Sequence, residues 1–281
     1  MNKLSAYKGR PGSLALRIMV DLSAALTVLV LVALVGYILY KGIPNLHLDL
    51  FQWTYTTDNV SMMPAIINTL TITFCSLLVA VPFGVFSAVY LVEYAGRGNK
   101  LVKVIRLTTE TLSGIPSIIY GLFGFLFFVV ALGWSYSILA GIMTLAIMIL
   151  PLIMRTTEEA LKAVPDTYRE GSFGLGAGKL RTVFKVVLPS AVPGILAGVI
   201  LGVGRIVGET AALIYTAGTV TGVASSLLSS GRTLSVHMYA LLSEGLYMDQ
   251  AYATAVVLLI MVIIINAISS LVAKKVAGKA A

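Results

Sequence analysis

The sequence is poor in the residues that carry most enzyme and metal chemistry. Its 281 residues include two histidines and one cysteine. His47 and His237 lie far apart, with no acidic or cysteine neighbour at metal-ligand spacing, so we predict no metal site. Cys75 has no partner for an internal disulfide. Because no nucleophile, base and orienting group come together, the chain is not expected to be an enzyme or to hold a cofactor.

A nucleotide-binding loop is also missing. The run from Gly174 to Lys179 resembles the phosphate-binding pattern G-x-x-x-x-G-K-[ST]. Phe173 stands where the first glycine belongs, however, and Leu180 replaces the hydroxyl residue. If the protein uses ATP, another subunit must bind it.

Charged residues are scarce and apolar residues abundant. Charged residues make up 11% of the chain, hydrophobic residues 58%, and the mean hydropathy is +0.95. These values are typical of a membrane protein. Six stretches reach the roughly 20 apolar residues that a bilayer-spanning helix needs. They run over about 18–40, 64–92, 111–133, 136–154, 190–217 and 251–273.

We therefore predict an all-α, polytopic membrane bundle with six transmembrane helices. Residues 1–17 form an N-terminal segment, 18–273 the six-helix domain, and 274–281 a tail. The second and fifth stretches exceed the minimum length, so they are expected to tilt, kink or project from the bilayer.

The basic residues are distributed unevenly between the two sides of the membrane. Of 20 lysines and arginines, 17 fall on one side, which predicts that both termini and the connection over about 155–189 are cytoplasmic. This bias also explains the net charge of +8 without nucleic acid as a partner. The 17 are Lys3, Lys8, Arg10, Arg17, Arg97, Lys100, Lys103, Arg106, Arg155, Lys162, Arg169, Lys179, Arg181, Lys185, Lys274, Lys275 and Lys279.

The connection over 155–189 has the marks of a folded element. Pro165 ends the helix before it, Asp166 is a good N-cap, and Gly176 is suited to a left-handed C-terminal cap. The pattern predicts a helix of about two to three turns over 166–176. Because so short a helix is marginal in water, we expect it to dock onto another protein surface.

The fifth stretch contains two charged residues. Arg205 and Glu209 are spaced to share one helix face and to pair, although an ionised side chain inside a bilayer costs roughly 2.5–3.5 kcal/mol by insertion scales. Gly194, Gly198 and Gly202 lie on the same stripe and would allow close helix approach. We expect Arg205 to meet an anion, with a purely structural ion pair as the alternative.

Other polar residues in the apolar stretches are ambiguous. Ser113 and Ser117 flank Pro116 and either line a pathway or serve local packing. The same two interpretations apply to Asn68 and Thr69, and Asp21 is close enough to the membrane edge to reach water.

Residues Glu170 to Pro189 match a known spacing. Glu170, Gly171, Ser172, Gly176, Val186 and Leu188-Pro189 resemble the pattern E-A-A-x3-G-x9-I-x-L-P of binding-protein-dependent ABC importer permeases. Gly171 and Ser172 replace the two alanines, and Val186 replaces the isoleucine, which preserves small size and apolarity.

Within that family, nearly the whole chain resembles the PstA-type phosphate permeases. The runs that carry this resemblance are Ser113–Ser117, Tyr120–Gly124, Val164–Gly171 and Gly204–Ala211. The last run places an arginine and an acid on the fifth helix, a pattern that is similar to phosphate permeases rather than to those for sugars or amino acids.

The resemblance implies a type I ABC importer fold in the bacterial inner membrane. It implies three kinds of protein partner: a PstC-like second permease, a PstB-like ATPase dimer and a PstS-like protein that delivers inorganic phosphate. It assigns the substrate pathway to Arg205 and Glu209, with Ser113 and Ser117 as possible lining. The ATPase-coupling residues that it implies are Arg169, Glu170, Gly171, Gly176, Leu188 and Pro189.

Other functions remain open at this stage. Another tetrahedral oxyanion, such as molybdate, tungstate or sulfate, is the nearest alternative, because selectivity largely resides in the delivering protein. A secondary anion transporter would more often show inverted repeats, and a membrane enzyme would need clustered acids or histidines; neither pattern is present.

Overall fold

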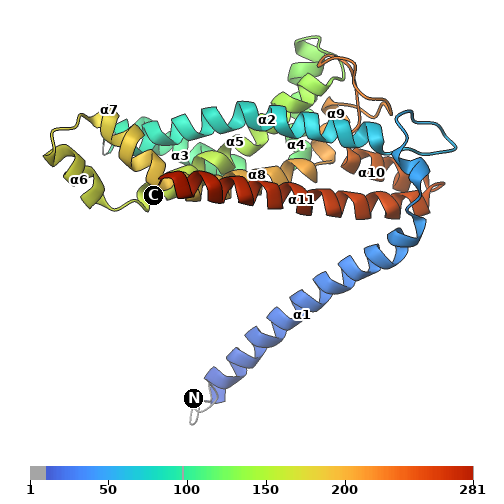
Figure 1. Cartoon of the computed structure of the whole chain (residues 1–281), viewed down its shortest axis with the longest axis horizontal. Coiled ribbons are helices and arrows are strands. Elements are labelled where there is room, and N and C mark those ends of the chain that lie inside the picture. The colour runs from blue at the N-terminus through green and yellow to red at the C-terminus, as the bar shows by residue number, and fades with distance from the viewer. Residues whose placement is uncertain (1–10, 97, 281) are drawn as a thin grey trace.

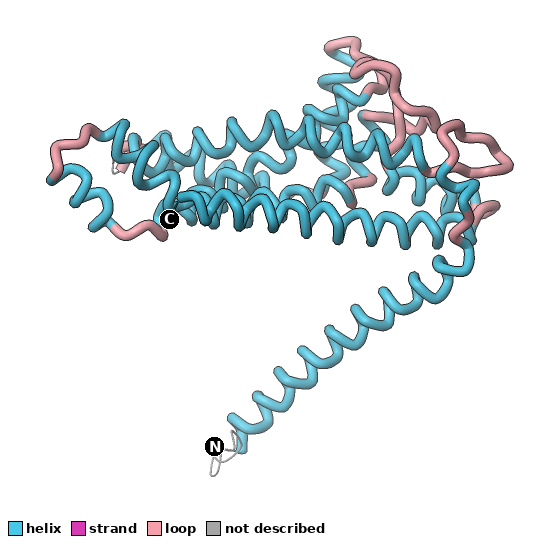
Figure 2. Tube along the Cα trace, viewed as in Figure 1, coloured by secondary structure: helices cyan, strands magenta, loops and turns pink. Residues whose placement is uncertain are grey.

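The computed structural model describes residues 11–96 and 98–280, and within them every regular element is a helix (Figures 1 and 2). Lys3, Lys8, Arg10 and Arg97 of the basic set lie outside the described residues. The helices are α1 (Pro11–Gly42), α2 (Met63–Val89), α3 (Lys100–Ser113), α4 (Ser117–Gly124), α5 (Ile138–Lys162), α6 (Asp166–Gly174), α7 (Lys179–Thr182), α8 (Leu188–Val207), α9 (Ala211–Thr216), α10 (Leu234–Glu244) and α11 (Met248–Ala280).

Shorter turns join these helices. Two 3₁₀ turns cover Ile43–Asn45 and Leu48–Phe51. Three π-helical segments extend or precede longer helices, at Tyr90–Tyr94 after α2, Phe125–Ala131 after α4 and Val183–Val187 before α8. Helix α11 continues to Ala280, so the predicted tail over 274–281 is largely helical.

Five helices in the described part of the chain are long and apolar enough to span a membrane, and six if one bent pair counts as a span. The five run over Gly12–Asn45, Met63–Tyr94, Ile138–Lys162, Lys179–Val207 and Met248–Ala273. The polytopic all-α prediction is confirmed.

The predicted third span differs in form from the structure. It is built from Lys100–Ser113 and Ser117–Ala131, which meet at 104°. Pro116 explains the break, because proline donates no backbone hydrogen bond and disfavours helical backbone in the residue before it. The apolar stretch predicted over 111–133 therefore belongs to a bent pair of helices rather than to one straight span.

The predicted fifth span is also interrupted. Helix α8 ends at Val207, Gly208 follows as its C-cap, and α9 begins at Ala211. Glycine is unfavourable in helix interiors, so Gly204 and Gly208 weaken this part of the helix. The stretch over 190–217, which was expected to tilt, kink or project from the bilayer, is thus divided between α8 and α9.

Helices α2, α5 and α8 pack around the main core, in which Leu145, Met148 and Ile149 of α5 are fully buried. The glycine stripe on α8 faces α5. A side chain on Gly194 would place its Cβ 2.6 Å from the Ala160 Cβ, and one on Gly198 would overlap Thr156. The predicted role of these glycines in close helix approach is confirmed.

Helix α1 leaves the bundle at a wide angle (Figure 1). Its C-terminal end contacts α11, where the rings of Tyr37 and Tyr252 meet edge to face at 5.9 Å between centroids. Most of its apolar side chains are exposed, including Leu26 and Leu29. This helix therefore offers bare apolar surface to lipid or to another subunit.

The two ends of the bundle differ. Helices α6 and α7 form one end, together with the C-terminal end of α11, and we name it the α6 end (Figure 1). Loop 43–62, helix α10 and the loop over 217–233 form the opposite end, which we name the α10 end.

Candidate functional site

Helix α6 forms where the sequence predicts a helix, but its N-terminus is built differently. Pro165 occupies the N-cap position and Asp166 is the first helical residue, so the predicted Asp166 N-cap is wrong. The Asp166 carboxylate instead accepts a bond from Arg169 at 3.2 Å. Proline fits the start of a helix because its fixed φ needs no adjustment and its missing N–H costs nothing there.

The C-terminal end of α6 agrees with the prediction. Gly176 has φ of +81°, the left-handed conformation that glycine adopts without strain. The Gly176 N–H donates to the Phe173 carbonyl at 2.9 Å, and the Ala177 N–H donates to the Ser172 carbonyl at 3.1 Å. These bonds satisfy carbonyls that the helix end leaves free.

Most of the surface of α6 is open to solvent and partly apolar; we name it the exposed face of α6. Tyr168, Phe173 and Leu175 are exposed, Leu175 to 91%. Glu170 and Gly171 are also exposed, and Glu170 forms no hydrogen bond or ion pair with the rest of the described chain. Exposed large apolar side chains around a charge are typical of a protein-binding surface.

Arg169 points the other way, into the subunit. Its guanidinium bonds the carboxylate of Glu93, which lies in the π-helical turn after α2, with Nη2 to Oε1 at 2.7 Å. It also donates to the backbone carbonyls of Val164 and Leu161. Arg169 therefore fixes α6 to the rest of the protein rather than projecting from its surface.

Leu188 and Pro189 lie at the start of α8, where Pro189 lines a cavity together with Tyr168 of α6. Leu188 packs against a buried cluster that includes Val183, Val187 and Ala191. Pro189 is in the first turn of α8 and is half-buried. The residues expected to couple to an ATPase thus divide into an exposed group on α6 and a group that supports it.

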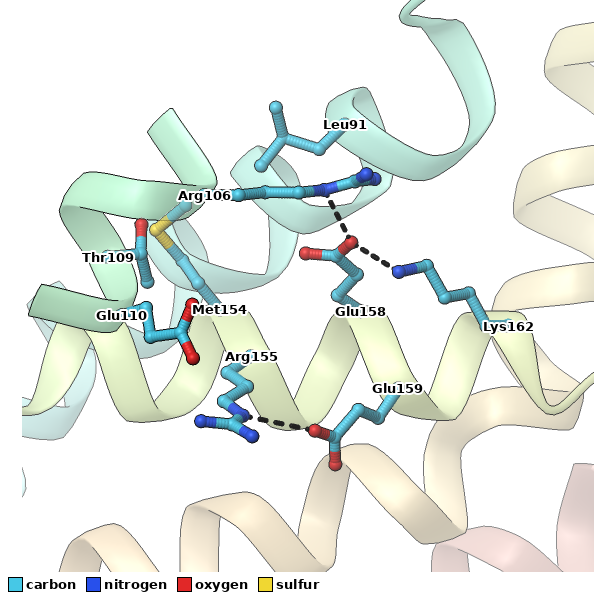
Figure 3. A pocket seen from close by; sticks show the side chains of 9 residues that line it. All are labelled: Leu91, Arg106, Thr109, Glu110, Met154, Arg155, Glu158, Glu159 and Lys162. Carbon is cyan, nitrogen blue, oxygen red and sulfur yellow. Dashed lines mark hydrogen bonds and ion pairs between the residues drawn. The ribbon is translucent and has the colours of Figure 1, made fainter. Parts of the chain in front are cut away.

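A charged cavity of about 210 Å³ opens near the α6 end, between the end of α2, α3 and α5 (Figure 3). Glu158 of α5 lies at its centre, 2.8 Å from Arg106 of α3 and 2.6 Å from Lys162. Arg155 pairs with Glu159 along α5 at 3.1 Å, and Glu110 faces the same space (Figure 3).

These charges were not singled out from the sequence. The four-residue spacings of Arg155 to Glu159 and Glu158 to Lys162 are a helix-pair signal that could have revealed them. The Arg106 contact had no such signal, because α3 and α5 lie far apart in the sequence.

Arg205 and Glu209 do not form the predicted pair. Arg205 is in the last turn of α8, whereas Glu209 lies beyond the helix end. The Glu209 Oε1 accepts a bond from the Ala212 N–H at 3.0 Å and so caps α9. The four-residue spacing brings two side chains together only on a continuous helix, and the break at Gly208 removes that condition.

Arg205 is left half-buried without a fixed partner. Within residues 11–96 and 98–280, no hydrogen bond or ion pair involves its guanidinium. Its charge acts on Tyr120 of α4, whose hydroxyl donates to the Leu112 carbonyl at 2.8 Å. A cation at the C-terminal end of a helix is favoured by the helix dipole. Its five N–H donors remain free for a ligand.

Ser113 and Ser117 flank the break between α3 and α4. The Ser113 hydroxyl donates to the Glu110 carbonyl at 2.7 Å, so it serves local structure there. Helix α4 then packs closely on α9, because a Cβ on Gly121 would lie 2.8 Å from the Ala212 Cα. Ser117 lies about one turn before Tyr120 on this helix.

At the α10 end, Asn68 of α2 holds the loop over 217–233. Its side chain donates to the carbonyls of Gly222 and Arg232 at 3.0 and 3.2 Å and accepts from the Ala224 N–H at 3.1 Å. The Thr69 hydroxyl oxygen accepts a hydrogen bond from the Leu234 N–H at 2.8 Å. The side chains of Asn68 and Thr69 therefore serve packing, through hydrogen bonds that span more than 150 residues of sequence.

A second buried cluster lies at the same end. The Arg232 guanidinium sits 4.8 Å from the Tyr55 ring centroid, and His237 lies edge to face with the same ring. Burial, together with the Arg232 charge, lowers the pKa of His237 to about 3. Burial also lowers the pKa of Arg232, opposed by its contact with Tyr55. Among the described residues, no group of three or more His, Cys, Asp and Glu is placed to hold a metal ion.

Comparison with known proteins identifies the family. Residues 80–280 match the family described as binding-protein-dependent transport system inner membrane component. The probable ABC transporter permease protein YqgI of Bacillus subtilis is 34% identical over 269 residues, which cover 88% of this chain and 90% of that protein.

Other relatives match over shorter stretches. The phosphate transport system permease protein PstA 1 of Mycobacterium tuberculosis is 42% identical over 141 residues, 50% of this chain and 46% of that protein. PstA of Pasteurella multocida is 39% identical over 63% of each chain. The match thus spans about half to two thirds of these PstA proteins.

Solved structures agree in fold. The chain superposes on a bacterial alginate ABC transporter with a TM-score of 0.63 and 17% identity, covering 92% of this chain and 96% of that one. It superposes on the MetNI methionine ABC transporter with a TM-score of 0.59 and 23% identity, covering 76% and 94%. The chain therefore belongs to the binding-protein-dependent transport system inner membrane component family and is a multi-pass permease subunit of an ABC importer with the type I fold.

Proposed function

We propose that this permease is the PstA-type subunit of an ATP-driven phosphate importer. One observation carries the proposal: the guanidinium of Arg205 is half-buried and has no fixed partner in the described chain. A guanidinium in a water-poor site binds an oxyanion through charge-assisted hydrogen bonds. The relatives named as phosphate transport permeases support the choice of anion.

The break between α8 and α9 suits a transient binding point. Because Glu209 caps α9 and does not pair with Arg205, the guanidinium is not neutralised in this conformation. We propose that Glu209 positions α9 beside Arg205 and keeps a negative charge nearby. An anion is then attracted strongly enough to enter but not so strongly that it fails to leave.

The exposed face of α6 is proposed to bind a PstB-like ATPase dimer. Tyr168, Phe173 and Leu175 would fill a groove of the ATPase, with Glu170 contributing charge complementarity. Charge reversal by Glu170→Lys should weaken co-purification of the ATPase, whereas the membrane helices should still assemble. The basic residues near this end favour a cytoplasmic position for it and for both termini.

The remaining partners follow from the same proposal. A PstC-like permease would complete the path, a PstS-like protein would deliver phosphate at the α10 end, and lipid would cover the rest. ATP binding would favour one conformation of the ATPase pair, and that difference in affinity would shift the membrane helices between two states. In this proposal ATP is bound by the partner, and the permease needs no cofactor.

The test is anion uptake in proteoliposomes that contain all four kinds of subunit, with ATP inside. We expect labelled phosphate to accumulate only with ATP and with the delivering protein. Excess unlabelled phosphate should compete, whereas sulfate, molybdate and tungstate should not. Competition by one of these anions, with poor uptake of phosphate, would assign the importer to that oxyanion. Uptake without ATP would identify a secondary transporter and overturn the proposal.

A further inference from the structure

The side chain of Arg169 is fully used within the subunit. All five of its N–H donors have an acceptor. Nε and Nη2 bond Glu93 Oε1 at 3.2 and 2.7 Å, and Nη2 also bonds the Leu161 carbonyl at 3.0 Å. Nη1 bonds the Val164 carbonyl at 2.9 Å and Asp166 Oδ1 at 3.2 Å. One residue of α6 thereby contacts the end of α5 and the end of α2.

The Arg169–Glu93 pair is shielded from water. The exposed fractions of the two side chains are 16% and 8%. A buried ion pair adds little net stability compared with an apolar pair of similar volume, but it holds its two partners in a defined geometry. The adjacent Glu170 is exposed and forms no bond within the described chain. Neighbouring residues of one short helix therefore face solvent and the interior of the subunit.

Glu93 occupies an uncommon backbone position. It lies in the π-helical turn Tyr90–Tyr94, which extends α2 and ends with a bond from the Ala95 N–H to the Tyr90 carbonyl at 2.9 Å. Such turns are rare and are frequently found at functional sites. This turn places a carboxylate at the end of the helix that packs most extensively against α5.

The other end of α2 holds the loop over 217–233. Asn68 contributes three hydrogen bonds to that loop, and Thr69 contributes one to the start of α10. About 25 residues separate Asn68 from Glu93, which corresponds to about 38 Å of helix. A single continuous helical element thus joins α6 at one end of the bundle to the loop at the other.

We propose that the Arg169–Glu93 pair is the joint that transfers movement of α6 to α2, and that α2 transfers it to the loop through Asn68. The inference rests on the proposed function, since it takes α6 as the element that the ATPase moves. Movement of α6 then changes the position of α2, and the Asn68 bonds make the loop follow. Arg169 and Glu93 are positioning residues and do not contact the transported anion.

The experiment measures movement of the loop directly. In a Cys75→Ala background, Val223→Cys places one thiol on an exposed loop position. Proteoliposomes containing the complete complex are labelled with a membrane-impermeant maleimide, with and without the non-hydrolysable nucleotide AMP-PNP. Labelling of this subunit is followed by mass spectrometry. We expect AMP-PNP to change the labelling rate when the joint is intact.

Glu93→Gln keeps the shape of the side chain but removes its charge, and Glu93→Asp keeps the charge but shortens the reach. Both variants should retain the ATPase during purification and continue to hydrolyse ATP. Glu93→Gln should lose the nucleotide-dependent change in labelling and lower uptake by about tenfold, within the range of coupling between distant sites. Glu93→Asp should show a partial loss of both. Asn68→Asp, which cannot donate to the loop carbonyls, should make labelling insensitive to AMP-PNP.

The matched control is Asp21→Asn, which removes an acid from an exposed ion pair within α1 and should leave the labelling change intact. A normal labelling change in Glu93→Gln would overturn the inference. So would loss of the ATPase from the purified complex, because the pair would then serve only docking. The labelling change does not depend on which anion is carried. Failure of phosphate uptake with a normal response to AMP-PNP would therefore count against the proposed substrate and not against the joint.

Discussion

Two arginines inside the protein have opposite environments. Arg169 uses every N–H donor within its own subunit, whereas the Arg205 guanidinium has no fixed acceptor in the described chain. The first arrangement fixes a helix, and the second leaves donors for a ligand. The environment of the side chain, rather than the residue type, thus distinguishes an arginine that fixes a helix from one whose donors remain available.

The largest expected effect is at Arg169. Arg169→Gln leaves the Glu93 charge buried without a partner, which should lower the free energy of unfolding by about 3–5 kcal/mol. The double variant with Glu93→Gln removes both charges and should recover most of that stability without recovering coupled uptake. Thermal unfolding of the purified permease, together with uptake in cells, checks both parts. A double variant with normal uptake would show that the pair is only structural.

At Arg205 we expect a loss of transport without a loss of stability. Arg205→Gln removes a charge-assisted contact worth about 1.5–3 kcal/mol, which corresponds to about 10- to 150-fold slower phosphate uptake. Lys41→Gln, an exposed basic residue at the α10 end, is the matched control and should be neutral. Labelled phosphate uptake in a host without its own permease measures the difference. Equal uptake by Arg205→Gln and the wild type would contradict an anion-binding role.

Glu209 gives a sharper comparison with Arg205. Because the two side chains do not pair, the double change to Gln at both positions should not restore uptake relative to Arg205→Gln alone. Recovery in the double variant would mean that the residues act as a pair in another conformation. The size of the complex, measured by gel filtration, serves as the assembly control.

The buried cluster at the α10 end should make stability depend on pH. The pKa of His237 is about 3 in the folded protein and about 6.5 when unfolded, so the unfolded state binds the proton first as pH falls. Stability is therefore full above about pH 6.5 and decreases as pH falls toward 3, by about 2 kcal/mol at pH 5. The groups facing His237 include Arg232 and Tyr55.

Thermal unfolding at pH 7.5 and pH 5 tests this dependence. His237→Gln should reduce the difference in Tm between the two conditions, and the exposed His47→Gln should not. An unchanged difference in the His237 variant would assign the pH dependence to other groups.

The smallest expected effect is at the end of α6. Gly176 has φ of +81°, and no other atom lies within 4 Å of the position that a Cβ would occupy there, so any cost of Gly176→Leu arises from the backbone alone. That cost is about 1–2 kcal/mol. Gly178→Leu is the matched control, since its φ of −72° suits any residue and its surroundings are equally open. ATPase co-purification should fall for the first variant only.

The sequence predicted what is local in the chain. Hydropathy located the membrane helices, and Pro165 with Gly176 located α6, because both signals depend on neighbouring residues. The glycine stripe on α8 was also predictable from helix periodicity. The break near Gly208 was not, since the expected Arg205–Glu209 pair assumed a continuous helix.

Contacts between distant segments were beyond the reach of the sequence. Glu93 and Arg169 are separated by 76 positions, and Asn68 lies 154 positions from Gly222. A lone acid after an apolar run is an ordinary end of a membrane helix, and an asparagine inside one has several possible partners. Only the packing of α2 in the bundle, chiefly against α5, determines which partners they find.

The most direct test compares the two arginine sites in one assay. Proteoliposomes with the Val223→Cys probe would be prepared with Arg205→Gln or with Glu93→Gln, and both phosphate uptake and the labelling response to AMP-PNP would be measured. We predict that both variants transport poorly, but that only Glu93→Gln loses the labelling response. The same labelling behaviour in both variants would contradict the proposal that Arg205 binds the anion whereas the Arg169–Glu93 pair transfers the movement of α6.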